Sequence, residues 1–309
     1  MLLAVLALLA AAAYANMQRG LRALGLELGF DFLRVEAGFD IAEGPAYSPG
    51  DTYARAFWVG VVNTLRVTAV GLVGATVVGV VVGVTRLSSN WLVRSLAAVY
   101  VEVVRNVPLL LQLLFWYGAV FLQLPPVRQS ITWLGVIHVT QRGIYLPRLV
   151  WQDGRPLWEV PVLQGFNFRG GVHLSPEFAA LVLGLVIYTG AFIAEVVRGA
   201  VQSVPRGQWE AAEALGLGHL QTLRLVVVPQ ALRIIVPPLT NQYLNLAKNS
   251  SLAVAIGFPD LFSVGHTILN QTGQSIPVFV MIMATYLSMS LVTSALMNLY
   301  NRRVRLVER

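Results

Sequence analysis

The hydropathy pattern constrains this chain most, because five stretches are long and apolar enough to cross a lipid bilayer as helices. A bilayer core of about 30 Å is crossed by roughly 20 apolar residues in a helix. With 56% hydrophobic and 12% charged residues, the 309-residue chain is too apolar for a water-soluble protein. The sequence therefore predicts an all-α integral membrane protein with about five to six transmembrane helices. The five stretches, some with polar interruptions, are residues 57–85, 96–124, 177–200, 232–257 and 276–300.

A sixth apolar stretch at residues 2–15 is too short to span comfortably. We interpret residues 1–16 as a truncated first transmembrane helix. The alternative is a secretory signal peptide, since Ala13-Tyr14-Ala15 resembles a cleavage site, although no basic region precedes it.

Arginines in the short loops predict the orientation, because cytoplasmic loops are enriched in basic residues. They place residues 205–233 and the C-terminus in the cytoplasm. Alternate crossing then puts the segment 17–55 and the aromatic-rich insertion 125–176 outside, as lids or interfacial elements. The transmembrane domain covers 56–309 and includes the insertion. The arginines used are Arg86, Arg94, Arg206, Arg224, Arg233, Arg302, Arg303, Arg305 and Arg309.

Several function classes are disfavoured by what the sequence contains. The net charge of +7 could suggest nucleic acid, but the arginines cluster at the ends of apolar runs, as membrane topology requires. There is no cysteine, the four histidines are scattered, and no hydrolase or zinc-protease motif is present. Lys248, the only lysine, follows no Gly-rich phosphate loop, so any ATP is hydrolysed by another chain. We predict no catalytic residue, cofactor or metal site.

Two Glu-x-x-Arg pairs lie inside predicted spans, where charges are costly and usually functional. They are Glu102 with Arg105 and Glu195 with Arg198. A separation of three residues puts both charges of a pair on one helix face, where they can neutralise each other. The pairs are either structural ion pairs at the cytoplasmic rim or charges that line a translocation path.

A polar stripe marks the fourth of the five long spans. Asn241, Asn245, Lys248 and Asn249 fall at helical spacing in a segment that is too polar to face lipid on all sides. Pro237-Pro238 is expected to open and bend this helix. The stripe suits contact with a substrate carboxylate, or polar contact between subunits.

The cytoplasmic loop contains an acidic, alanine-rich helix, QWEAAEALG at residues 208–216. Its small side chains keep one side narrow enough to enter a groove on a second protein. Gly216 and Gly218 are expected to end the helix, before a second short segment begins near Val226. A membrane-surface helix is the alternative, but alanine buries little apolar area.

This loop resembles the coupling loop of bacterial ABC importer permeases. The sequence has the E-A-A, three residues, G, nine residues, I-x-L-P pattern of that family, with valines in place of isoleucine and leucine. The matching residues are Glu210, Ala211, Ala212, Gly216, Val226, Val228 and Pro229.

Further segments are similar to the polar amino acid permeases, which include histidine, glutamate, glutamine, arginine and opine transporters. They are Asn63-Thr64-Leu65, residues 102–112, residues 188–199 and Lys248-Asn249-Ser250-Ser251-Leu252. Arg19-Gly20 and residues 29–33 resemble the general L-amino-acid subtype, whose first helix is longer than the one here.

The resemblance implies a type I permease fold and an inner-membrane importer for polar L-amino acids. It implies a second permease subunit, two cytoplasmic ATPases and a periplasmic binding protein that delivers substrate. Glu210, Ala211, Ala212, Gly216 and Pro229 would then couple to the ATPase. We expect Asn245, Lys248 and Asn249 to contact substrate, with Glu102, Arg105, Glu195 and Arg198 as gate or pathway charges.

Two other readings are left open by the residues alone. A secondary transporter driven by an ion gradient would also place charges in spans, but would need no groove-fitting acidic helix. A membrane scaffold or receptor would explain the outside segments, but gives the buried polar stripe no purpose.

Overall fold

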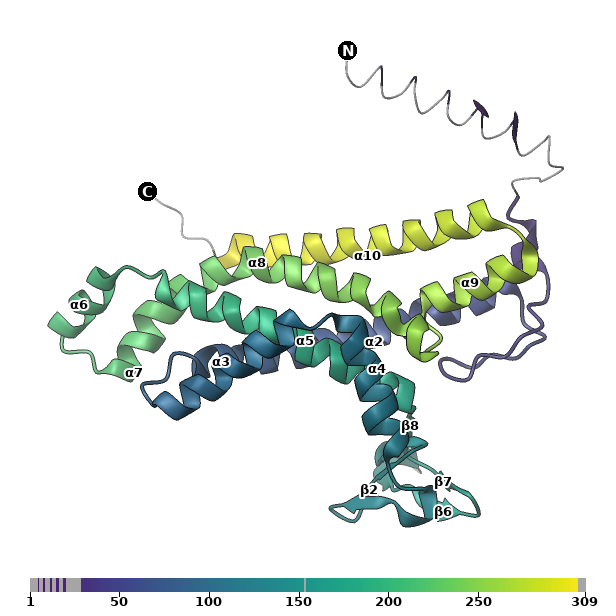
Figure 1. Cartoon of the computed structure of the whole chain (residues 1–309), viewed down its shortest axis with the longest axis horizontal. Helices are drawn as coiled ribbons and strands as arrows, with labels where there is room; N and C mark the ends of the chain where they lie inside the picture. The colour runs from purple at the N-terminus through teal and green to yellow at the C-terminus, as the bar shows by residue number, and fades with distance from the viewer. Residues whose placement is uncertain are drawn as a thin grey trace.

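The computed structural model describes residues 29–152 and 154–304 continuously, and residues 5, 8, 12, 15, 16, 19 and 20 singly. Long helices lie side by side along its longest axis (Figure 1). The described part of the chain has four helices that could each cross a membrane, and a fifth span if one bent helix pair is counted. All five expected stretches are therefore helical, whereas the expected first helix falls largely outside the described residues. The long helices are α2 (Tyr53–Thr85), α5 (Pro176–Gln202), α8 (Val228–Asn249) and α10 (Ser275–Val304).

The span expected at residues 96–124 is broken rather than continuous. It consists of α3 (Trp91–Asn106), α4 (Leu109–Leu114) and short helical turns to Gln123, and the two halves are bent by 105°. Pro108 disfavours helical backbone at the residue before it, and Val107 is extended. The Gln112 side chain donates hydrogen bonds to the carbonyls of Val104 at 2.9 Å and Val107 at 3.0 Å, which satisfies groups left by the break.

The next-to-last span begins earlier than the sequence indicated. A single helical course runs over His219–Ile256, through α7 (His219–Thr222), a π-helical turn, α8 and the 3-10 helix η6 (Ser250–Ile256). Pro237 and Pro238 lie in the interior of α8, so the prediction that they open the helix was wrong. The expected separate segment near Val226 is likewise part of this continuous helix.

Close packing between α2 and α5 holds the centre of the bundle. A Cβ on Gly79 would lie 2.5 Å from the Ile193 side chain, and one on Gly83 would lie 2.8 Å from the Ala194 carbonyl oxygen. The glycine pair therefore allows close backbone approach, as its Gly-x-x-x-Gly spacing indicates.

The insertion between the broken span and α5 is built of β-strands, which the sequence analysis did not foresee. It projects sideways from the helices (Figure 1). One antiparallel sheet has the order β1-β2-β3-β8, and β4 with β5 and β6 with β7 form hairpins. Gly154 and Gly165 take left-handed conformations, with φ 75° and 67°, at the two hairpin turns. The strands are β1 (Ile131–Trp133), β2 (Ile137–Thr140), β3 (Gly143–Leu146), β4 (Arg148–Gln152), β5 (Arg155–Glu159), β6 (Val162–Gln164), β7 (Asn167–Arg169) and β8 (Val172–Leu174).

Residues 29–52 cover one end of the bundle, together with α9 (Leu261–Thr272). Ala37 and Tyr53 share an apolar core with Ile268 of α9 and Ile282 of α10. The start of α9 is fixed by α2, because the Thr64 hydroxyl accepts a hydrogen bond from the Leu261 amide at 2.9 Å. The α6 helix (Arg206–Ala214) lies at the other end, here called the α6 end (Figure 1).

Candidate functional site

The α6 helix presents one face to its own chain and the other to solvent. Ala212 is only 2% exposed, and Trp209 packs on an apolar cluster of α5 and α8. Trp209 also stacks on His219, with ring centroids 5.9 Å apart. Glu210 and Ala211 are exposed, as are the other outward residues of this helix. Of the predicted coupling residues, Glu210 and Ala211 therefore lie on the free face, and Ala212 anchors the helix from behind.

Gly216 ends α6 by its backbone conformation, with φ 78°. The Gly216 amide donates to the Glu213 carbonyl at 2.9 Å, and the Leu217 amide donates to the Ala212 carbonyl at 3.1 Å. These are the two hydrogen bonds of a Schellman motif, which favours glycine at this position. A Cβ on Gly216 would have no heavy atom within 4 Å, so conformation rather than space explains the glycine. Pro229 is exposed in the first turn of α8.

Uncovered apolar side chains flank α6 at the tip of the bundle. Leu215 is 81% exposed and Leu220 is 78% exposed. Beside them, a cleft of about 1210 Å³ separates the α2–α3 loop from α6 and α7, with Arg94, Arg206 and Trp209 among its lining residues. A narrow helix with exposed leucines next to a cleft is typical of a surface that binds another protein.

A second candidate site is a polar pocket between α5 and α8. Its volume is about 280 Å³, near the lower end of the range for small-molecule pockets. Arg105, at the end of α3, lies beside it, because its guanidinium stacks over the Phe192 ring at 5.0 Å. Arg105 thus contacts a residue that lines the same pocket as the predicted pathway residues Asn245 and Asn249. The lining residues are Tyr188, Thr189, Phe192, Gln242, Asn245 and Asn249.

The donors and acceptors of this pocket suit a small zwitterion. Amide and hydroxyl groups can both donate and accept hydrogen bonds, and the nearby guanidinium offers a positive charge. Sequence reasoning did not select Tyr188, Thr189 or Gln242 as site residues. Lys248 is exposed on α8 and does not line the pocket.

The two Glu-x-x-Arg pairs behave differently. Glu102 and Arg105 form no ion pair with each other among the described residues, so the structure does not contain the mutual neutralisation that their spacing allows. Glu195 does pair with Arg198, and it also pairs with Arg86 at the end of α2. Arg86 was used only as an orientation signal, because its pairing with Glu195 joins residues 109 positions apart in the chain. This triad ties α2 to α5 near the α6 end.

Glu195→Leu should destabilise the protein, because it leaves Arg86 and Arg198 without their shared carboxylate. The Arg86 side chain is only 13% exposed, so we expect a loss of about 2 kcal/mol. Thermal unfolding of the purified protein in detergent checks this. Glu102→Leu is the matched control, since Glu102 is exposed and has no ion pair in the described part of the chain. Equal shifts in the two variants would contradict a structural role for the triad.

The membrane-length helices, one of them broken, are those of a multi-pass membrane protein. Residues 75–306 match the family described as "Binding-protein-dependent transport system inner membrane component", and the chain belongs to this family. The family resemblance and the type I fold expected from the sequence are thereby confirmed.

Two similar proteins are named as permeases, in agreement with this family. The chain is 45% identical to the putative amino-acid ABC transporter permease protein YhdX of Escherichia coli K12, over 95% of this chain and 90% of the relative. It is 43% identical to the general L-amino acid transport system permease protein AapQ of Rhizobium johnstonii, over 91% of this chain and 84% of the relative.

Solved structures show the same fold. A chain in the crystal structure of an amino acid ABC transporter with histidines superimposes with a TM-score of 0.60 and 28% identity, covering 81% of this chain and 95% of that chain. A chain of the MetNI methionine ABC transporter in an inward-facing conformation has a TM-score of 0.58 and 20% identity, covering 82% and 97%. The chain is thus a multi-pass membrane permease subunit of an ABC importer, which implies ATPase and binding-protein partners and places ATP hydrolysis on another chain.

Proposed function

We propose that this chain is one of two different permease subunits in a bacterial inner-membrane importer for polar L-amino acids. Two cytoplasmic ATPases drive the pair, and a periplasmic binding protein delivers the substrate. The transported class is inferred from YhdX and AapQ, whose names describe amino-acid permeases. Each alignment covers most of this chain and most of the relative, which supports the same role as an amino-acid permease.

The observation that carries the proposal is the exposed face of α6. Glu210 and Ala211 are free of intramolecular burial, while Trp209 and Ala212 hold the helix onto the bundle. A firmly held helix with a free narrow face can transmit a push from an ATPase, because it moves as a rigid body with α5 and α8. Gly216 fixes where α6 ends. Pro229 lies in the first turn of α8, the helix that transmits the push further into the bundle.

The polar pocket supplies the substrate path in this proposal. Arg105, Asn245 and Asn249 contact the amino acid between α3, α5 and α8. Glu102 and Lys248 extend the path on exposed surfaces that a second permease subunit covers, while Glu195 and Arg198 hold the gate near the α6 end. Nucleotide drives alternating access by binding unequally to the inward and outward states. If Lys248→Ala changes neither rate nor substrate preference, that exposed face serves subunit contact alone.

Purification from native membranes, followed by uptake in reconstituted vesicles, tests this function. We expect an ATPase and a second permease to copurify, and L-amino-acid uptake to require ATP and the binding protein. Uptake that survives ATP depletion but collapses with the proton gradient would instead indicate a secondary transporter. An intact complex whose ATPase is not stimulated by substrate would indicate a scaffold or receptor.

A further inference from the structure

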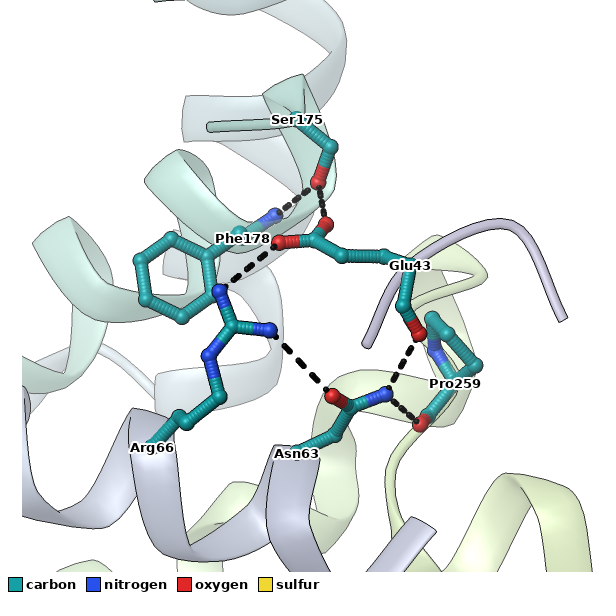
Figure 2. A network of polar contacts seen from close by, with 6 residues as sticks. All are labelled: Glu43, Asn63, Arg66, Ser175, Phe178 and Pro259. Carbon is teal, nitrogen blue, oxygen red and sulfur yellow. Dashed lines mark hydrogen bonds and ion pairs between the residues drawn. The ribbon is translucent and has the colours of Figure 1, made fainter. Parts of the chain in front are cut away.

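A polar network joins four parts of the chain at the end opposite α6 (Figure 2). Glu43 comes from the segment 29–52, and Asn63 and Arg66 come from α2. Ser175 caps the start of α5 directly after the β-strand insertion, and Pro259 precedes α9. The two segments expected outside the membrane therefore meet at Glu43 and Ser175.

The backbone of Glu43 is held independently of its carboxylate. The Asn63 side-chain amide donates hydrogen bonds to the Glu43 carbonyl at 2.8 Å and to the Pro259 carbonyl at 2.9 Å. The next residue, Gly44, has φ 133°, and a Cβ there would lie 2.8 Å from Asn63 Oδ1. Because the main chain is fixed, the Glu43 side chain can change rotamer without release of the whole segment.

The Glu43 carboxylate is only partly satisfied where it lies. Its Oε2 accepts a hydrogen bond from the Ser175 hydroxyl. Its Oε1 is buried with no hydrogen-bond donor among the described residues, and is 3.8 Å from Nη2 of Arg66. Burial raises the pKa of Glu43 above its usual value, although Ser175, Arg66 and His173 act in the opposite direction and Glu177 adds to the rise. A buried carboxylate oxygen without a donor costs free energy, so this contact is weaker than one with a fully hydrogen-bonded carboxylate.

Arg66 is positioned by groups other than Glu43. Its guanidinium stacks over the Phe178 ring at 5.5 Å, and its Nη1 donates to Asn63 Oδ1 at 3.4 Å. That is its one hydrogen bond among the described residues, although a guanidinium has five N–H donors. The Arg66 side chain is 39% exposed, compared with 14% for Glu43. An oriented, half-exposed guanidinium with unused donors matches the geometry of a carboxylate.

We propose that Arg66 is a carboxylate-binding residue at the end opposite α6, and that Glu43 occupies it until an incoming carboxylate replaces it. The inference rests on the proposed function, since the carboxylate belongs either to the transported amino acid or to an acidic side chain of the binding protein. Both sources present the same chemistry, and both approach from the side where the two outside segments meet.

Chemical labelling of Arg66 in the complete complex tests the site without any measurement of transport. Phenylglyoxal, which modifies arginine, should label Arg66 at least threefold more in Glu43→Ala than in the wild type. If the carboxylate belongs to the transported amino acid, L-glutamine should reduce this labelling of Arg66. If it belongs to an acidic side chain of the binding protein, substrate-free binding protein should reduce the labelling. Arg148, released by Glu159→Ala from its exposed 2.7 Å ion pair, is the control that neither should protect. Lack of protection by both would overturn the proposal.

Uptake kinetics provide a second, independent test of the Arg66 site. Arg66→Gln should raise the KM of uptake, or the binding-protein concentration for half-maximal uptake, by about tenfold. Arg66→Lys should have an intermediate effect, because lysine keeps the positive charge but cannot donate two parallel hydrogen bonds to a carboxylate. Glu43→Gln should lower the same quantity several-fold by removing the competing charge. The double variant should behave as Arg66→Gln alone, because Glu43 acts through Arg66. Additive effects, or no effect of Arg66→Gln, would overturn the proposal. If the wild-type complex takes up no amino acid, the proposed function fails, while the labelling result still decides the site.

Discussion

Glu210→Lys should abolish ATP-dependent uptake while the permease pair still assembles in the membrane. Glu210 is exposed on the free face of α6, and Trp209 and Ala212 hold the helix from its other face. The substitution therefore leaves the fold of α6 intact. A reversed charge at a docked interface costs several kcal/mol, enough to prevent productive ATPase binding. Vesicle uptake measures the loss, and copurification of the second permease measures assembly.

Glu36→Lys is the matched control for this result. Glu36 is also exposed, but it lies in the segment 29–52 at the opposite end of the bundle. The same charge reversal there should leave ATPase copurification unchanged. Normal uptake by Glu210→Lys, or an equal loss of ATPase copurification in both variants, would argue against ATPase docking on α6.

The long helices and α6 were predictable because their signals are local. Apolar runs of membrane length can satisfy their backbone only as helices, so α2, α5 and α10 follow from hydropathy alone. The end of α6 was predictable for a similar reason, since Gly216 is the residue type that a left-handed cap prefers. Both inferences need only neighbouring residues.

The break after Asn106 and the continuity of α8 depend on tertiary contacts. Pro108 interrupts one helix, where Gln112 satisfies the freed carbonyls, whereas Pro237 and Pro238 remain within another. The proline signal is the same in both places, so the sequence could not separate the outcomes. The β-strands of the insertion are only three to five residues long, too short to show a clear alternation in the sequence. One of their pairings also joins residues that are distant in the chain, Ile144 and Leu174.

The candidate pocket was also predictable only where the signal is local. The spacing of Asn245 and Asn249 placed both on one face of α8, and the structure puts both in one pocket. The contact partner of Arg105 was not predictable, because it does not lie on the same helix. Arg105 stacks on Phe192 of α5, a residue of another helix.

Asn249→Leu should reduce the kcat/KM of amino-acid uptake by about tenfold to a hundredfold. Leucine is similar in size to asparagine, but it removes both the donor and the acceptor from a pocket already lined by hydroxyl and amide groups. Loss of one hydrogen bond to a charged substrate group costs about 1.5–3 kcal/mol. Asn245→Leu should have a smaller effect, because Asn245 is exposed whereas Asn249 is half-buried.

Asn241→Leu separates the pocket from the general polarity of α8. Asn241 belongs to the same stripe and is exposed, but it does not line the pocket. If the stripe only joins subunits, Asn241→Leu and Asn249→Leu should weaken copurification of the second permease alike and leave KM unchanged in the remaining complexes. If Asn249 contacts substrate, Asn249→Leu alone should change KM and substrate preference, since subunit contact by itself does not distinguish one amino acid from another. Equal kinetics in the two variants would therefore remove the pocket from the transport path.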